Sequence, residues 1–391
     1  MKSAARPFSR IARSICTFTP CGHPLIDMQR LQRQDAGATA ELRTALFEYG
    51  YFYAANVEDL SADYIASIYA YSKRCHALPT DVKYKYRQRG GTGVYSGPDI
   101  GQHELQYEAD GVAARVCGWD YSRARFSLGD GKTEGDARYP SASELDPPYA
   151  EVLDDCYARQ DKLARVLLGG FERALELPTD TLLSMFEGEG GDFGTIRLLH
   201  YPGHDDVDGT IKGTAAISRV DTTGIGAHTD FECFTLMHQT APGLQLLPPR
   251  RVTSRKRGSA NGGACAPAED VHAEWIDAPV RPAEFVVILG DMMERLTNGS
   301  LLATPHRVLP TEHARDSIIR FNAFAPGTLI APLRPFVTPE SPAAYSPVEM
   351  RIHMETTMRN LEAGLGSWDT ERRRSRSATF DYGGERRVLE V

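Results

Sequence analysis

The pattern of hydrophobic and polar positions predicts a helix-rich first half. Apolar side chains in 36–50 recur at the spacing of one helix face and stop at a glycine, which predicts an amphipathic helix. The aromatic run 51–55 predicts a strand. Ser61 is placed to cap a second helix that ends before Pro79. Residues 147–177 then carry a long apolar stripe with a helical period.

Short apolar runs divided by Gly and Pro replace this pattern from about residue 193. Such runs predict the strands of a sheet-rich core. We expect these strands at residues 195–201, 224–238, 243–247, 284–289, 303–309 and 316–325. The polar stretch 86–145 predicts mainly loops. Residues 345–363 predict a closing helix, and the charged tail 371–377 is expected to lie in solvent.

Three potential metal ligands lie in the strand-rich half. His228 and Asp230 are two residues apart, so on a strand their side chains would point to the same side. His306, on a later expected strand, could reach the same point if the two strands pair. Two His and one carboxylate leave open positions on an octahedral ion, which is the ligand set of non-haem Fe(II) oxygenases. The sequence therefore predicts a catalytic Fe(II) site formed by His228, Asp230 and His306.

A His-x-Asp pair arises easily by chance in a chain with 11 His and 52 acidic residues, so the surrounding residues decide its meaning. Nine residues after His306, Arg315 and Ser317 form another i, i+2 pair. A guanidinium fork and a hydroxyl donor suit a carboxylate. The combination predicts a co-substrate that chelates the metal and has a carboxylate at its far end, and 2-oxoglutarate fits that description.

The residues around these side chains resemble a known family, the isopenicillin N synthase-like 2-oxoglutarate/Fe(II)-dependent dioxygenases. The likeness extends over roughly residues 22–360. It is carried by Arg197–Pro202, Gly226–Met237, Pro242–Leu246, Asn298–Ser300, His306–Val308 and Arg315-x-Ser317. In some relatives the tyrosine at the position of Tyr201 bonds the co-substrate, so the resemblance adds Tyr201 to Arg315 and Ser317 as expected 2-oxoglutarate contacts.

The resemblance implies a double-stranded β-helix (jelly-roll) core with an α-helical N-terminal region and a C-terminal helix. It implies an enzyme that uses Fe(II), O2 and 2-oxoglutarate, with ascorbate as a further candidate cofactor. Such an enzyme would oxidise a small organic substrate and release succinate and CO2. The expected divisions are a disordered or targeting segment (1–21), an N-terminal region (22–145), a linking helix (146–190), the core (191–335), and a C-terminal helix and tail (336–391).

Three departures from the family pattern stand out. The gap between His228 and His306 is longer than usual, and a basic polar segment at 250–270 accounts for the excess as an expected mobile surface insertion. Leu199 stands where many plant members carry Asn. Arg320 is a charge within an apolar run, which makes it an alternative to Arg315 as the carboxylate-binding residue.

Other functions remain open at this point. The chain could be an Fe(II) oxidase of the same family that does not use 2-oxoglutarate, or a non-catalytic metal- or ligand-binding module. A zinc hydrolase is disfavoured because the chain lacks a His-Glu-x-x-His helix. His200, His204 and His238 lie near the motifs, but their spacing makes them weaker ligands. We expect them on the surface or beside the site.

Composition narrows the possible partners. The net charge of −8 and the pI of about 5.8 give no reason to expect nucleic-acid binding, and the chain lacks the roughly 18-residue apolar run that spans a bilayer. Seven scattered cysteines indicate reduced thiols inside a cell. The Arg-rich, acid-poor start is typical of a basic terminus or a mitochondrial transit peptide. We expect a cytoplasmic monomer, with the mitochondrion as the alternative.

Overall fold

The computed structural model describes most of the chain outside its first 16 residues and several internal segments. The N-terminal segment up to residue 16 and the expected insertion at 250–270 lie outside the described residues. The described residues are 17–88, 93–102, 116–123, 138–188, 191, 193–203, 224–249, 274–310, 312–369, 371–383 and 386–391.

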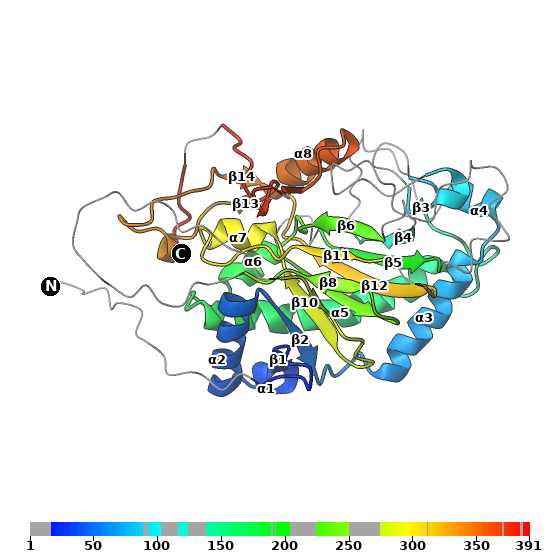
Figure 1. Ribbon diagram of the computed structural model, residues 1–391, viewed down its shortest axis with the longest axis horizontal. Helices are drawn as coiled ribbons and strands as arrows, with labels where there is room; N and C mark the ends of the chain where they lie inside the picture. Colours follow the sequence, from blue (N-terminus) through cyan, green and yellow to red (C-terminus); the bar gives the residue numbers. More distant parts are fainter. Residues whose placement is uncertain are drawn as a thin grey trace.

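Two β-sheets form the centre of the described structure (Figure 1). The larger, eight-stranded sheet has the order β1 (Leu25–Asp27), β2 (Tyr51–Ala55), β10 (Phe285–Leu289), β7 (Phe234–Gln239), β12 (Arg315–Asn322), β5 (Thr195–Tyr201), β4 (Cys117–Tyr121) and β3 (Tyr95–Ser96). The smaller sheet has the order β6 (Ile225–His228), β11 (His306–Val308), β8 (Leu244–Leu246) and β9 (Ile276–Asp277). The neighbours β10, β7, β12, β5 and β4 are all antiparallel, as a jelly roll requires.

Helices cover the face of the larger sheet that is turned away from the smaller sheet. The long helix α5 runs behind the strands in Figure 1. The described helices are α1 (Met28–Gln32), α2 (Ala36–Thr44), α3 (Ala62–His76), α4 (Thr80–Lys85), α5 (Tyr149–Ala174), α6 (Thr181–Phe186), α7 (Asp291–Leu296) and α8 (Met350–Glu362). Short elements complete the fold: the π-helix Ala45–Tyr49, the 3-10 turns Pro98–Ile100 and Arg334–Phe336, and the strands β13 (Leu329–Ile330), β14 (Val348–Glu349), β15 (Trp368–Asp369) and β16 (Arg374–Ser375).

Local sequence signals explain several of these boundaries. The first expected helix is confirmed as α2 and the following π-turn, and it ends at Gly50, whose φ of 73° lies in the left-handed region. The Ser61 side chain caps α3 by accepting a hydrogen bond from the Tyr64 backbone N–H. The long helix α5 and the closing helix α8 also lie where their apolar stripes predicted them.

Side chains of β12 point alternately to the space between the two sheets and to the helical layer. Arg315, Ser317 and Ile319 point to one side, where Ile319 packs in a buried cluster with residues of both sheets such as Tyr201 and Val308. The intervening side chains point to the helical layer. The space between the sheets therefore receives the Arg315 and Ser317 side chains, which are both buried.

The structure adds detail to three expectations. The run 224–238 is two strands, β6 and β7, because the chain turns between them and passes from the smaller to the larger sheet. The stretch 86–145 contributes β3 and β4 to the larger sheet rather than loops alone. The tail at 371–377 is not wholly in solvent, because Ser375 and Ser377 are buried.

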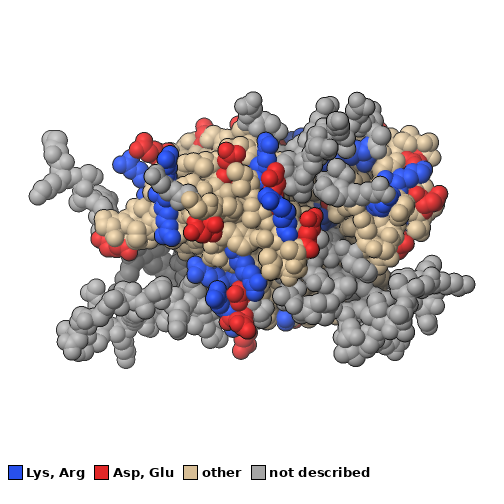
Figure 2. Space-filling view, turned by 90° about the horizontal axis from the view of Figure 1, so that it is seen from above, with Lys and Arg blue, Asp and Glu red and all other residues tan. Residues whose placement is uncertain are grey.

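The described surface has mixed charge on the face that Figure 2 shows. Lys and Arg side chains lie interspersed with Asp and Glu there, so that face does not present one sign of charge (Figure 2). Among the helices that the structure describes, none is both long and apolar enough to cross a membrane.

Candidate metal centre

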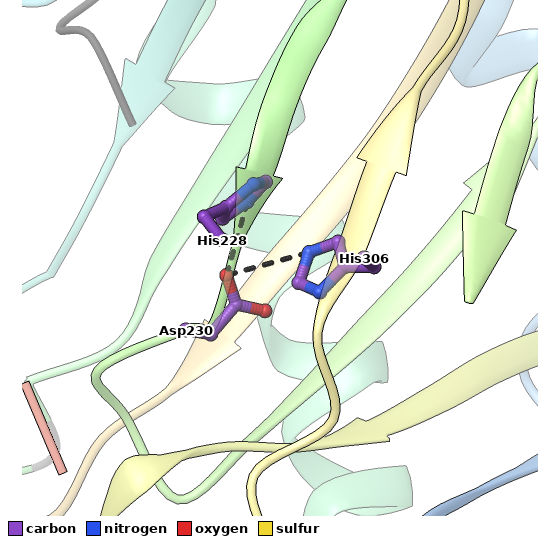
Figure 3. A group of neighbouring side chains, drawn as sticks. All are labelled: His228, Asp230 and His306. Carbon is purple, nitrogen blue, oxygen red and sulfur yellow. Dashed lines mark ion pairs between the residues drawn. The ribbon is translucent and has the colours of Figure 1, made fainter. Parts of the chain in front are cut away.

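The structure brings the three expected metal ligands together. His228, the last residue of β6, is the direct cross-strand neighbour of His306 on β11, and their rings are 4.2 Å apart between centroids. Asp230 Oδ1 lies 3.7 Å from His228 Nε2 and 3.6 Å from His306 Nε2 (Figure 3). Two ligands on opposite sides of one ion at about 2.1 Å would be about 4.2 Å apart, so both separations permit a shared ion.

One part of the expected geometry was wrong. The strand β6 ends at His228, so Asp230 lies in the turn that follows and not on the same strand. The turn still directs the carboxylate toward both imidazoles (Figure 3). Among the described residues, these three are the group of His, Cys, Asp and Glu side chains whose ligand atoms converge closely enough for a metal ion.

Backbone carbonyls set the tautomer of both imidazoles. His228 Nδ1 lies 2.8 Å from the Gly226 carbonyl oxygen, and His306 Nδ1 lies 3.1 Å from that of Thr304. A carbonyl only accepts a hydrogen bond, so each Nδ1 must carry the proton. In a neutral imidazole this leaves Nε2 unprotonated on the side of Asp230, as a metal ligand requires.

The carboxylate of Asp230 is also held in place. Thr235, the second residue of β7, donates a hydrogen bond from its hydroxyl to Asp230 Oδ2. That bond turns the other oxygen, Oδ1, toward the two histidines. A residue of the larger sheet thus orients Asp230, which lies in the turn after β6 of the smaller sheet. The set of two imidazoles and one carboxylate fits a divalent ion such as Fe(II).

Burial favours the neutral, ligand form of the first histidine. Burial, together with the neighbouring His306, lowers the pKa of His228 to about 3. Two buried carboxyl groups near the ligands have the opposite shift. Burial, with Asp230 nearby, raises the pKa of Glu232 to about 8, and burial raises that of Asp291 to about 8. Sequence reasoning missed both groups. Asp291 lies far from the ligand motif along the chain, and nothing in the sequence indicated that Glu232, two residues after Asp230, would be buried.

The expected co-substrate residues lie together on neighbouring strands. Arg315 is the cross-strand partner of Tyr201, and its guanidinium carbon lies 4.7 Å from the centre of the Tyr201 ring. Arg315 donates to Gln239 Oε1 at 2.8 Å and to the Ser317 hydroxyl at 3.5 Å, while its Nε has no hydrogen-bond partner among the described residues. A fully buried cation is thus held by neutral groups between the sheets.

Arg320, the alternative carboxylate-binding residue, has a different role. It points to the helical layer, where it pairs with Asp161 Oδ1 at 3.0 Å and donates to the Tyr157 carbonyl at 3.1 Å. Its guanidinium also lies over the Tyr157 ring. The charge within this apolar run therefore anchors α5 to β12, and the structure favours Arg315 as the residue that faces the interior.

The other candidate histidines are placed away from the triad. His200 Nδ1 bonds Asp316 at 2.7 Å, and His238 Nδ1 bonds the Tyr69 hydroxyl at 2.9 Å. Their strand neighbours Leu199 and Met237 face the cluster between the sheets, so both histidines point to the helical side. His238 is buried and not on the surface, and His204 lies outside the described residues.

Comparison with protein families agrees with this geometry. Residues 193–323 match the family model of the 2OG-Fe(II) oxygenase superfamily. Residues 23–110 match the N-terminal model described as non-haem dioxygenase in morphine synthesis. The first match contains the triad together with Tyr201, Arg315 and Ser317.

Curated relatives are named as dioxygenases or hydroxylases. The chain is 28% identical to a 2-oxoglutarate-dependent dioxygenase of Aspergillus flavus, over 73% of this chain and 79% of that one. It is 26% identical to a homoarginine-6-hydroxylase of Arabidopsis thaliana, again over 73% of this chain and 79% of the relative.

Solved structures share the fold at low sequence identity. A full-length Neurospora crassa protein, solved in complex with alpha-KG and thymine, is 18% identical and has a TM-score of 0.63 over 88% of this chain and 97% of that one. The rice dioxygenase for auxin oxidation is 20% identical, with a TM-score of 0.61 over 90% and 99%. The fold, the ligand set and the family matches agree: the chain belongs to the 2OG-Fe(II) oxygenase superfamily and is a 2-oxoglutarate- and Fe(II)-dependent dioxygenase.

Proposed function

We propose that this dioxygenase oxidises a C–H bond of a small organic molecule, with Arg315 and Ser317 binding the far carboxylate of 2-oxoglutarate. The observation that carries the co-substrate assignment is the burial of the Arg315 guanidinium between the sheets beside the neutral Gln239 and Ser317. A buried charge without a counter-ion is costly. A carboxylate supplied by the co-substrate would offset that cost.

The surroundings of Arg315 suit this role. Gln239 holds one terminal nitrogen of the guanidinium, and the Tyr201 ring covers its face. Both contacts restrict the side chain, so little rotational freedom remains to be lost when an anion binds. Leu199, the cross-strand neighbour of Ser317, adds apolar surface beside the hydroxyl. Low local polarity strengthens a charge-assisted hydrogen bond.

Fe(II) held by His228, Asp230 and His306 and 2-oxoglutarate together supply the oxidising chemistry, in which O2 is consumed and succinate and CO2 are released. The chain itself positions and excludes water. The two Nδ1–H groups stay on backbone carbonyls and hold the rings still. The burial of all three ligands keeps bulk water away from the reacting atoms.

The substrate class is inferred from chemistry in related proteins. Named relatives include a homoarginine-6-hydroxylase and a codeine O-demethylase, and the Neurospora crassa neighbour has been solved with thymine. The mixed charge of the face in Figure 2 gives no support to a nucleic-acid substrate. We therefore assign a small organic molecule and not a macromolecule as the substrate.

Succinate release tests this proposal. Protein loaded with Fe(II) should form succinate slowly from 2-oxoglutarate alone, and faster with the true substrate in a panel of small amines, acids and heterocycles. Consumption of O2 without succinate formation would instead support an oxidase that does not use 2-oxoglutarate. Metal binding without any O2 consumption across the panel would support a binding module.

A further inference from the structure

The C-terminal part of the chain returns to the metal centre. Strands β15 and β16 pair with each other, with Trp368 opposite Ser375, to form a C-terminal hairpin. In Figure 1 this red segment lies beside α7 and α8. The sequence gives little hint of this placement, because the segment is short, polar and rich in arginine.

The hairpin touches Thr229, the residue between the ligands His228 and Asp230. The Thr229 hydroxyl donates to Ser375 Oγ at 2.8 Å, and the Ser367 hydroxyl donates to the Thr229 carbonyl at 3.3 Å. Thr229, Ser367 and Ser375 are all buried. Both ends of the hairpin therefore hold the peptide that joins two metal ligands.

The contact continues from the hairpin to Asp291 at the start of α7. Ser375 Oγ accepts from the Ala378 backbone N–H at 3.0 Å and donates to Asp291 Oδ1 at 2.9 Å, and Ser377 donates to Asp291 Oδ2. The Asp291 backbone N–H in turn donates to the carbonyl of Asp230 at 2.9 Å. A closed chain of hydrogen bonds thus runs from the ligand turn through the hairpin and back to the ligand turn.

Apolar and cationic contacts fix the hairpin from its other sides. Trp368 packs in a small cluster with Ala227, which directly precedes His228. Arg295 of α7 donates to the carbonyls of Ala378 at 2.8 Å and Phe380 at 3.2 Å, in the segment that directly follows the hairpin. The hairpin is therefore packed against the part of the described structure that holds the metal ligands.

We infer that the C-terminal hairpin positions the metal ligands, through the Thr229–Ser375–Asp291 hydrogen bonds, and so sets the affinity of the site for its metal. Thr229, Ser375 and Asp291 act as positioning residues because none of them supplies a ligand atom to the group that converges on the ion. Partners that orient metal ligands from outside typically change metal affinity by about 10- to 100-fold when they are removed. This inference rests on the assignment of the metal to His228, Asp230 and His306.

Anaerobic Fe(II) titration of the full chain tests the inference. Thr229→Val keeps the shape of the side chain but removes its hydroxyl, and it should weaken Fe(II) binding about tenfold or more. Thr229→Ser keeps the hydroxyl and should restore the affinity. Ser375→Ala removes the bond from Thr229 and also the bond to Asp291, so it should weaken Fe(II) binding at least as much as Thr229→Val. The double variant should bind Fe(II) no more weakly than Ser375→Ala alone, because the Thr229–Ser375 bond is already lost in that single variant.

Thr379→Val is the matched control. Its hydroxyl also lies in the C-terminal segment, but Thr379 is exposed and its hydroxyl bonds only the backbone carbonyls of Ser375 and Arg376 among the described residues. We expect this variant to bind Fe(II) as the wild type does. In Co(II)-loaded protein, the visible ligand-field bands should shift in Thr229→Val and stay unchanged in Thr379→Val.

The outcomes separate the inference from the metal assignment. Asp230→Ala must lose Fe(II) binding, and if it does not, the metal assignment itself fails. If Asp230→Ala loses binding while Thr229→Val keeps wild-type affinity and bands, the positioning role of the hairpin is overturned. Should Ser375→Ala fail to fold, the comparison of Thr229→Val with Thr229→Ser still shows whether the Thr229 hydroxyl supports Fe(II) binding.

Discussion

Replacing Arg315 by Met removes the charge that we assign to the far carboxylate of 2-oxoglutarate. The guanidinium is fully buried, faces the space between the sheets and already has Gln239 and Ser317 as neutral partners. A hydrogen bond to a charged group contributes about 1.5–3 kcal/mol. At about 1.4 kcal/mol for each factor of ten, Arg315→Met should raise the KM for 2-oxoglutarate roughly 10- to 150-fold.

Arg320→Met is the matched control, because it removes the same charge from the same strand. Arg320 points to the helical layer and pairs with Asp161, so its loss should reduce stability and leave the KM for 2-oxoglutarate unchanged. Breaking one side of a buried pair is destabilising, although Asp161 keeps a second partner in Arg165. The melting temperature of Arg320→Met should therefore fall.

Succinate formation at increasing 2-oxoglutarate and saturating Fe(II) measures this difference, and a separate Fe(II) titration shows whether the metal site is intact. Arg315→Met should keep its Fe(II) affinity. The reasoning is refuted if Arg320→Met raises the KM and Arg315→Met does not. If neither variant changes the KM for 2-oxoglutarate, neither arginine of β12 binds the co-substrate.

Three further predictions concern other parts of the structure. Thr235→Val removes the donor to Asp230 Oδ2 and should weaken Fe(II) binding about tenfold, whereas Thr235→Ser should retain it in the same titration. Gly50→Ala should lower the free energy of unfolding, measured in urea, by about 1 kcal/mol or more, because φ is 73° and a Cβ would lie 2.3 Å from Thr304 Oγ1. Gly327→Ala is the control, because a Cβ there would meet open space. A short Gly-Ser connection in place of 250–270 should preserve Fe(II) binding, because β8 and β9, on either side of that segment, pair directly; loss of binding would show that the segment supports the site.

The sequence was sufficient where one residue pattern decides the structure. The strand β5 occupies 195–201 as its apolar pattern predicted, and α5 follows its helical period. The convergence of His228, Asp230 and His306 was also predictable, because these three side chains are chemically distinctive. Their cross-strand pairing followed from the expectation that two nearby strands meet.

Long-range contacts account for what the sequence did not predict. The strand β4 has the unpromising sequence Cys-Gly-Trp-Asp-Tyr, and it becomes a strand by pairing with β5, where Asp120 meets Arg197 in an ion pair at 2.7 Å. Neither residue predicts the other across a separation of 77 positions. The sequence likewise did not predict that Arg320 pairs with Asp161 of α5, and that ion pair explains a charge within an apolar run.

The C-terminal hairpin is the clearest case. A polar segment with several arginines is typical of a solvated tail, yet Ser375 and Ser377 are buried because their hydroxyls bond Asp291. Hydrophobic periodicity carries no information about a segment that is buried by hydrogen bonds. The split of 224–238 into two strands has a similar origin, because the apolar pattern continues through a turn that changes sheets.

The central claim is that His228, Asp230 and His306 hold Fe(II) and that 2-oxoglutarate binds the same ion. Anaerobic addition of Fe(II) and then 2-oxoglutarate, followed by visible absorption, measures it directly. The wild type should show a weak charge-transfer band that saturates at one equivalent of Fe(II), and Asp230→Ala should show none while its circular dichroism stays unchanged. A wild type without the band, or an Asp230→Ala variant with the same band and iron content, would contradict the account.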